Sequence, residues 1–150
     1  MKNKDKTEIL NIIGNYIKHE KVQEMKKYIQ HGSITTYKHA INVVKLVYIL
    51  DKKYKLGADR KKLLVGALLH DFYLYDWHTE GLKHGLHGYT HPHTAAVMAK
   101  EVFDVDADIE SMIETHMWPL TLFHMPKSKE AWILCIADKL SSMAETLWMR

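Results

Sequence analysis

Apolar residues recur along most of the chain at intervals of three and four, which is the spacing of one face of an α-helix. The alternation of apolar and polar residues that is typical of a half-buried strand does not occur. The helical pattern fills segments at about residues 7–19, 22–29, 33–54, 58–69, 92–103, 109–116 and 128–147. We therefore predict an all-α protein: a single-domain helical bundle of about six to seven helices over residues 1–150. Residues 1–31 are expected to form covering helices on a core made by residues 32–147.

Serine, glycine and proline residues mark where these helices begin and end. Ser33 and Ser128 are predicted N-caps of the helices that follow them, and Gly57 separates two helical segments. Pro92 suits the first turn of a helix, whereas Pro119 should end the preceding one. The segment 72–90 has neither period and combines glycines with aromatic residues and histidines, so we predict a long functional loop there.

Composition narrows the function classes. The formal net charge is +3 with scattered lysines, which argues against a nucleic-acid duplex as partner. A single cysteine, Cys135, excludes an internal disulfide and suits packing in a reducing compartment. Because no apolar run is long enough to span a bilayer, we expect a cytoplasmic protein without a membrane partner. The unusual figure is a count of 11 histidines.

Six residues with metal-binding side chains lie on, or at the edge of, the apolar stripes. The sequence LLVGALLHD ends its apolar run with His70 and Asp71, and a carboxylate buried there needs a partner or a cation. His91 falls on the inward stripe of its helix, whereas His93 falls on a half-polar face, so His91 is the better candidate. The full candidate set is His39, His70, Asp71, His91, His116 and Asp138.

A single histidine on an apolar face is more often a core residue bonded to a carbonyl group, and only the combination of several helices favours a metal site. Four imidazoles and two carboxylates are too many ligands for one tetrahedral zinc, but they suit two ions that share a carboxylate. Mixed nitrogen and oxygen donors favour Mn, Fe, Co, Ni or Zn. We expect His19, His31 and His124 to be solvated. Four aromatic residues near the ligands are candidates for a pocket wall: Tyr73, Tyr75, Trp77 and Trp118.

The order of these residues resembles the HD-domain superfamily of metal-dependent phosphohydrolases. The segments YKHAINV, LLHDF, THPHTAA, ETHMWP and IADKL stand where that family has its successive motifs, over about residues 32–145. The resemblance implies an HD-type helical fold with a first metal site and a second one that shares Asp71. The first site would use His39, His70, Asp71 and Asp138, and the second Asp71, His91 and His116. Tyr73 and Leu74 stand where cyclic-dinucleotide enzymes of this type have a glycine and a lysine, which argues against that substrate.

The resemblance implies hydrolysis of a small anionic phosphorylated substrate, with His70 and Asp71 as catalytic residues and a metal-bridging hydroxide as nucleophile. Two alternatives remain open: an HD-fold diiron oxygenase with the same ligands, and a non-catalytic ligand-binding or regulatory domain. A homo-oligomer is compatible with the sequence. The candidate side chains for binding phosphate are His78, Lys83, His84, His87 and Lys139.

Overall fold

The computed structural model describes residues 1–78 and 86–148, and the helical prediction is confirmed. The helices are α1 (Asn3–Lys18), α2 (Glu20–Glu24), α3 (Thr36–Tyr54), α4 (Arg60–Leu69), α5 (His87–Phe103), α6 (Ala107–Thr115) and α7 (Lys129–Trp148). A short 3-10 helix (Met25–Lys27) and the strands β1 (Ile29–His31) and β2 (Ile34–Thr35) lie between α2 and α3.

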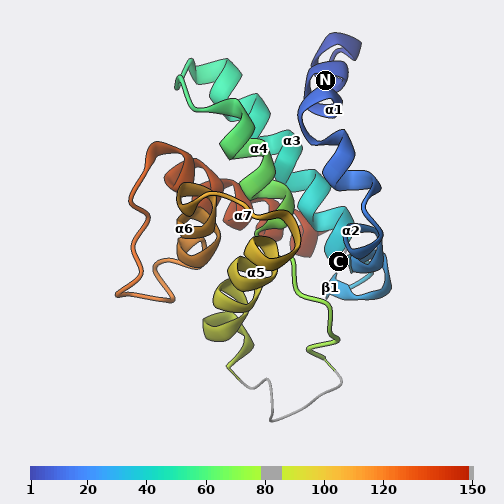
Figure 1. Cartoon of the computed structure of the whole chain (residues 1–150), viewed down its shortest axis with the longest axis vertical. Coiled ribbons are helices and arrows are strands. Elements are labelled where there is room, and N and C mark those ends of the chain that lie inside the picture. Colours follow the sequence, from blue (N-terminus) through green and yellow to red (C-terminus); the bar gives the residue numbers. More distant parts are fainter. Residues whose placement is uncertain (79–85, 149–150) are drawn as a thin grey trace.

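Helix α4 occupies the centre of the bundle. It contacts α1, α3, α6 and α7, and Figure 1 shows α3 and α4 running side by side through the middle of the molecule. Every residue from 63 to 69 is buried, so this part of the helix is apolar on all sides, as expected of a core helix. Gly66 allows α6 to approach closely, because a Cβ atom there would lie 2.7 Å from Cε of Met112. The central position of α4 places its C-terminal end, where His70 and Asp71 follow, inside the protein.

The segment between α2 and α3 differs from the prediction. The helix predicted over 22–29 is confirmed only as far as residue 27, through α2 and the 3-10 helix, and an antiparallel pair of strands, β1 and β2, follows it. Gly32 makes the turn between them with a positive φ of 54°, a conformation that glycine adopts at little cost. The N-cap of α3 is not Ser33 but Thr35, whose hydroxyl accepts a hydrogen bond from the backbone N–H of Lys38 at 3.2 Å. Extended backbone suits the β-branched residues around this turn, and these strands are too short to show alternation.

Helix α5 also differs, because it begins at His87 and not near Pro92. The N–H groups of Tyr89 and Thr90 close its first turn by donating to the carbonyl group of Leu86, at 2.8 and 3.0 Å. Pro92 therefore lies inside the helix, at a position where its ring removes one backbone hydrogen bond. The predicted loop over 72–90 therefore extends too far at its C-terminal end, because residues 87–90 are helical.

Other predicted boundaries are confirmed. The hydroxyl of Ser128 accepts a hydrogen bond from the N–H of Ala131 at 3.1 Å, which caps α7. Gly57 has a positive φ of 68° at the break before α4, and the side chain of Asp59 caps that helix. Each cap satisfies an N–H group that has no partner within the helix.

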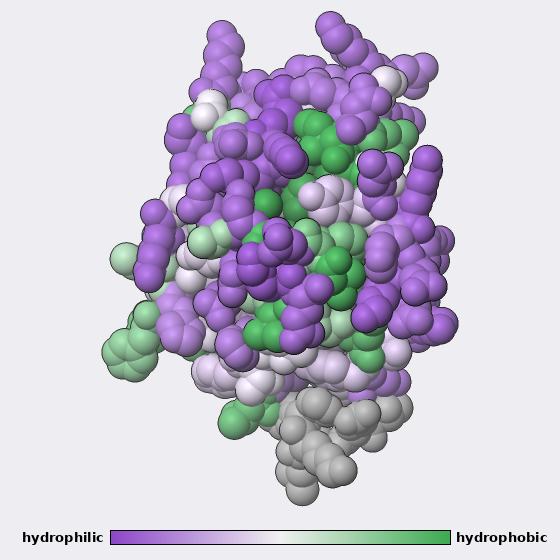
Figure 2. Space-filling view, in the orientation of Figure 1, coloured by the Kyte–Doolittle hydropathy of each residue, from purple (hydrophilic) through white to green (hydrophobic). Residues whose placement is uncertain are grey.

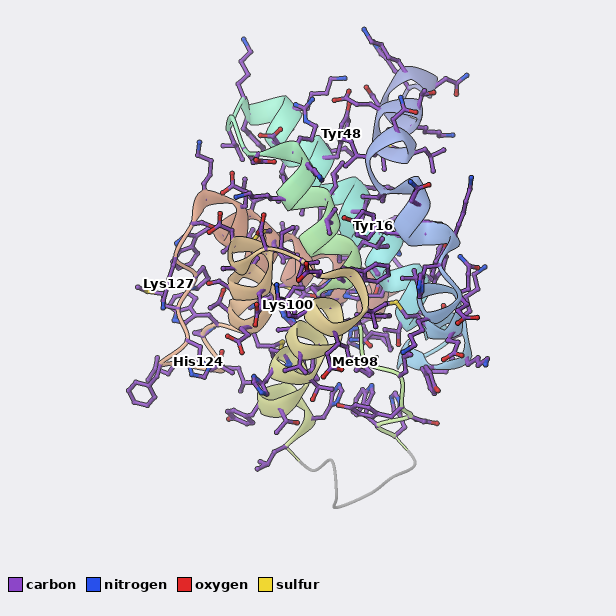
Figure 3. The ribbon with its side chains drawn as sticks, in the orientation of Figure 1. Tyr16, Tyr48, Met98, Lys100, His124 and Lys127 are labelled. Carbon is purple, nitrogen blue, oxygen red and sulfur yellow. The ribbon has the colours of Figure 1, made fainter. Side chains whose placement is uncertain are left out.

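A polar cluster joins α1, α3 and α4 at one end of the bundle. The guanidinium of Arg60 lies 3.1 Å from the carboxylate of the buried Asp51, and also bonds Glu8. The hydroxyl of Tyr48, labelled in Figure 3, donates to Glu8 at 2.7 Å. These contacts pair the buried carboxylate and hold the N-terminal helix against the core.

The outer surface is mainly polar. Figure 2 shows hydrophilic side chains over most of one face, with hydrophobic ones in the breaks between them. Within the described residues, none of the helices combines the length and the apolar character that crossing a membrane requires.

The central helix should carry much of the stability. Leu64 is fully buried. The substitution Leu64→Ala should lower the free energy of unfolding by about 2–5 kcal/mol, because apolar burial is lost and a cavity remains. The matched change Leu10→Ala, on α1 at a side chain that is 55% exposed, should change it by less than about 0.5 kcal/mol. Urea unfolding of metal-free protein, followed by circular dichroism, measures both values. Equal losses in the two variants would contradict the assignment of α4 to the core.

Candidate metal centre

The structure brings all six predicted ligands together in the interior. His39 comes from α3, and His70 with Asp71 follow the last turn of α4. Three further helices supply one residue each: His91 on α5, His116 directly after α6, and Asp138 on α7. All six side chains are buried.

The first set of ligand atoms surrounds Oδ2 of Asp71. Nε2 of His70 lies 3.3 Å from this oxygen, and Nε2 of His39 lies 3.6 Å from it. Oδ1 of Asp138 completes the set, at 3.0 Å from Nε2 of His39 and 3.6 Å from Nε2 of His70. Two carboxylate oxygens and two imidazole nitrogens therefore face one another.

The second set surrounds Oδ1, the other oxygen of Asp71. Nε2 of His91 lies 3.1 Å from it and Nε2 of His116 lies 3.6 Å from it. The two imidazole nitrogens are themselves 3.1 Å apart. The single carboxylate of Asp71 thus lies between two groups of histidines and presents one oxygen to each.

Backbone carbonyl groups fix the orientation of three of the rings. A carbonyl oxygen can only accept a hydrogen bond, so each of these Nδ1 atoms must carry a proton. In the neutral ring the lone pair is then on Nε2. The donor and acceptor pairs are His70 with Ala67 at 2.8 Å, His91 with His87 at 2.7 Å, and His116 with Ile113 at 2.6 Å.

His39 is oriented by a carboxylate that the sequence did not indicate. Its Nδ1 lies 2.8 Å from Oε2 of the buried Glu145, and Asn42 and Ser141 donate to the other oxygen of that carboxylate. Histidine ligands of metals commonly donate their second N–H to such a group. Glu145 falls seven residues, or about two turns, beyond Asp138 on the inward side of α7, which is the only signal that could have indicated it.

The donor set fits cations. Imidazole lone pairs only 3.1 Å apart repel each other unless a proton or metal ion lies between them. Oδ1 of Asp71 is buried without a hydrogen-bond partner, a costly state for a carboxylate oxygen. Burial would raise the pKa of Asp71, but His70 and the other histidines hold it well below the usual range. Burial would lower the pKa of His39, yet the carboxylates of Asp138 and Glu145 raise it to about 9. The site therefore attracts positive charge.

Comparison with known proteins agrees with this arrangement. Residues 36–143, about from the start of α3 to the last turns of α7, match the HD domain. The chain belongs to the HD-domain family. No curated protein and no solved structure gives a significant match to it. The part of the chain that matches the HD domain contains all six candidate ligands, and buried His and Asp groups of this kind could hold metal ions.

One further contact to the centre comes from the strand before the HD-domain match. The side-chain amide of Gln30, on β1, donates to Oδ2 of Asp71 at 2.7 Å. The hydroxyl of Tyr73 in turn donates to the amide oxygen of Gln30. Sequence reasoning missed Gln30 because it assigned residues 1–31 to helices that only cover the core. Gly32 between β-branched residues is the signal that could have indicated the strands.

His31 was expected to be solvated, but it is half-buried beside the centre. Its ring lies edge-on to His39, with 5.5 Å between the ring centroids, and its Nε2 is 3.3 Å from the hydroxyl of Ser142. The structure also groups His31 with His39 and Glu145 as side chains close enough to share an ion. The turn at Gly32 is what directs this residue inward.

A cavity of about 760 Å³ opens beside the ligands of the HD domain. Its lining includes the predicted phosphate-binding residue Lys139, whose ammonium donates to the carbonyl oxygen of His116 at 2.8 Å. Two other predicted phosphate-binding residues do not line it: His78 is exposed, and His87 is buried in a stack between Trp77 and His91. Lys83 and His84 fall outside the described residues.

The aromatic residues expected to wall a pocket do not line this cavity either. Tyr73 supports Gln30, Trp118 packs against Trp132 at 5.1 Å, and Cys135 is a buried packing residue, as predicted. His93 is exposed and lies 2.7 Å from the carboxylate of Glu114, away from the ligand set.

Two histidines on one helix offer a direct test of the ligand set. In His91→Ala we expect the affinity for Mn to fall more than roughly 100-fold, because a donor is removed. His93→Ala should leave it unchanged, because that side chain faces solvent. Elemental analysis of protein loaded with Mn and desalted measures bound metal. Full retention in His91→Ala would refute the assignment.

The carboxylate behind His39 should also affect the affinity for metal. Glu145→Gln keeps the shape of the side chain but removes the charge that makes His39 more basic, so we expect Mn to bind roughly 10–100-fold more weakly. Titration against a competing chelator gives this affinity. The exposed change Glu101→Gln is the control, and thermal unfolding of both metal-free variants reports separately on stability. An unchanged affinity in Glu145→Gln would show that the hydrogen bond does not affect the centre.

Proposed function

We propose that this HD domain is a metal-dependent phosphohydrolase that cleaves the phosphoester bond of a small metabolite at a binuclear centre. The observation that carries the proposal is the position of Asp71, whose two buried oxygens face separate groups of imidazole nitrogens. A carboxylate shared in this way is the usual bridge between two ions. Membership of a family whose members are often metal-dependent hydrolases supports the same conclusion.

The donor atoms favour divalent transition metals. Mixed nitrogen and oxygen ligation suits Mn, Fe, Co, Ni or Zn better than Mg or Ca. His39, His70, Asp71 and Asp138 would hold one ion, and Asp71, His91 and His116 the other. When bound, such ions supply Lewis acidity, which neutralises phosphoryl charge and makes water a nucleophile near neutral pH.

The residues of the chain would prepare the reaction by holding donors and substrate in place. Gln30 would keep the carboxylate of Asp71 from rotating, the backbone carbonyl groups would keep three of the Nε2 atoms directed at the centre, and Glu145 would do so for His39. The cavity would admit the phosphoryl group of the substrate, with Lys139 beside it. In hydrolysis the oxygen of water bonds to phosphorus, the bond from phosphorus to the ester oxygen breaks, and that oxygen takes a proton. The products are phosphate, or a phosphate monoester from a diester, and an alcohol.

Activity under nitrogen tests this function. We expect protein loaded with Mn to hydrolyse p-nitrophenyl phosphate or its bis ester without oxygen, and a chelator to abolish turnover. Asp71→Asn should reduce kcat/KM by more than roughly 100-fold, because the shared charge is lost. The control Asp104→Asn, at an exposed carboxylate paired with Lys100, should retain the wild-type kcat/KM.

Other outcomes would contradict the proposal in distinct ways. Turnover that requires both iron and O₂ would favour the oxygenase. Protein that carries its metal but hydrolyses neither ester nor any member of a nucleotide and phosphomonoester panel would favour a ligand-binding domain.

A further inference from the structure

The cavity beside the ligands has an apolar wall. Four of its lining residues are apolar: Met117, Pro119 and Leu120, from the segment after α6, and Met143 of α7. None of these side chains can donate or accept a strong hydrogen bond. The part of the substrate that extends away from the metal centre would therefore contact mainly carbon and sulfur.

The polar side chains in the same cavity already have partners within the protein. The amide of Gln30 bonds Asp71 and accepts from Tyr73. The hydroxyl of Ser142 lies 3.4 Å from Oδ1 of Asp138, and the ammonium of Lys139 bonds the carbonyl oxygen of His116. A sugar or another polyhydroxylated group would have to compete with these contacts, so the cavity offers such a group little recognition.

The cavity also lacks the usual means of recognising a nucleobase. Among the described residues that line it there is no Phe, Tyr, Trp or Arg on which a base could stack. The lining histidine outside the ligand set, His31, already lies edge-on to His39 and close to Ser142. Nucleotides therefore fit the cavity poorly, although they carry the required phosphate.

The apolar wall continues onto the surface of α7. Leu140, Met143 and Leu147 are spaced three and four residues apart, so they share one face of the helix. These side chains are exposed, and Leu120, on the segment after α6, is 43% exposed. An aliphatic group longer than the cavity could thus remain in contact with apolar side chains beyond its mouth.

We infer that the preferred substrate is a phosphate ester of an apolar aliphatic alcohol. This inference rests on the proposed function. The phosphoryl group would occupy the end of the cavity that holds Asp71 and the histidines, and the alkyl group would lie between Met143 and Leu120. Affinity should then rise with chain length, because each methylene group leaves water for an apolar surface.

Binding of phosphonates, which resist hydrolysis, tests this without relying on turnover. We propose calorimetric titration of Mn-loaded protein with n-alkylphosphonates from methyl to octyl under nitrogen. Affinity should increase roughly two- to fourfold for each added methylene group until the apolar surface is covered. An affinity that does not depend on chain length would overturn the inference.

Two methionine variants locate the contact. Met143→Gln should reduce the ratio of octyl to methyl affinity by roughly fivefold or more, because a polar amide replaces part of the wall. Met125→Gln, at a side chain that is 52% exposed and does not line the cavity, should keep the wild-type ratio. Equal ratios in the two variants would show that the alkyl group lies elsewhere.

Turnover separates this inference from the proposed function. We expect a higher kcat/KM for n-octyl phosphate than for adenosine and uridine 5′-monophosphates, which share a primary alcohol as leaving group. Faster hydrolysis of the nucleotides would overturn the apolar substrate class but leave the phosphohydrolase intact. If loaded protein hydrolyses none of these esters and binds no phosphonate, the function and the inference both fail.

Discussion

The structure depends on one buried carboxylate that needs positive charge. Asp71 sits at the end of the central apolar helix, where an ionised group without compensation would cost several kcal/mol. The protein supplies only part of that compensation, because Gln30 donates to Oδ2 while Oδ1 has no donor. The imidazoles that face the two oxygens compensate this charge only when they carry an extra proton or hold a cation, because a neutral ring presents a lone pair there. The arrangement becomes favourable only when cations or protons enter it, which links the fold of the core directly to its chemistry.

Helix ends produce this arrangement. His70 and His116 are the C-cap residues of α4 and α6, and each donates its Nδ1 proton to a carbonyl group in the last turn. Carbonyl groups at a helix C-terminus lack helical partners and carry partial negative charge. The same carbonyl groups thus orient the imidazoles and add a negative potential near the ligand atoms. Because two helices end at the same place in the core, their carbonyl groups favour cations there in addition to the carboxylate side chains.

The sequence allowed prediction of the helical class and of the six converging residues for a simple physical reason. A polar group on an apolar stripe must face the interior, so each of His39, His91 and Asp138 could be placed from its own helix. Gln30 could not be found in this way, because its contact with Asp71 joins positions 41 residues apart through strands too short to show alternation. The start of α5 was missed for a different reason. Proline prefers the first turn of a helix, but here residues 87–91, before Pro92, are already helical.

The contacts of Gln30 and His31 show that residues outside the HD-domain match also shape the candidate metal centre. All six candidate ligands lie within the segment 36–143 that matches the HD domain, but Gln30 and His31 precede it. The N-terminal segment therefore does more than cover the core, since β1 places one side chain on Asp71 and another at the cavity. Metal binding can follow from the shared segment, whereas the shape and polarity of the cavity depend partly on residues outside it.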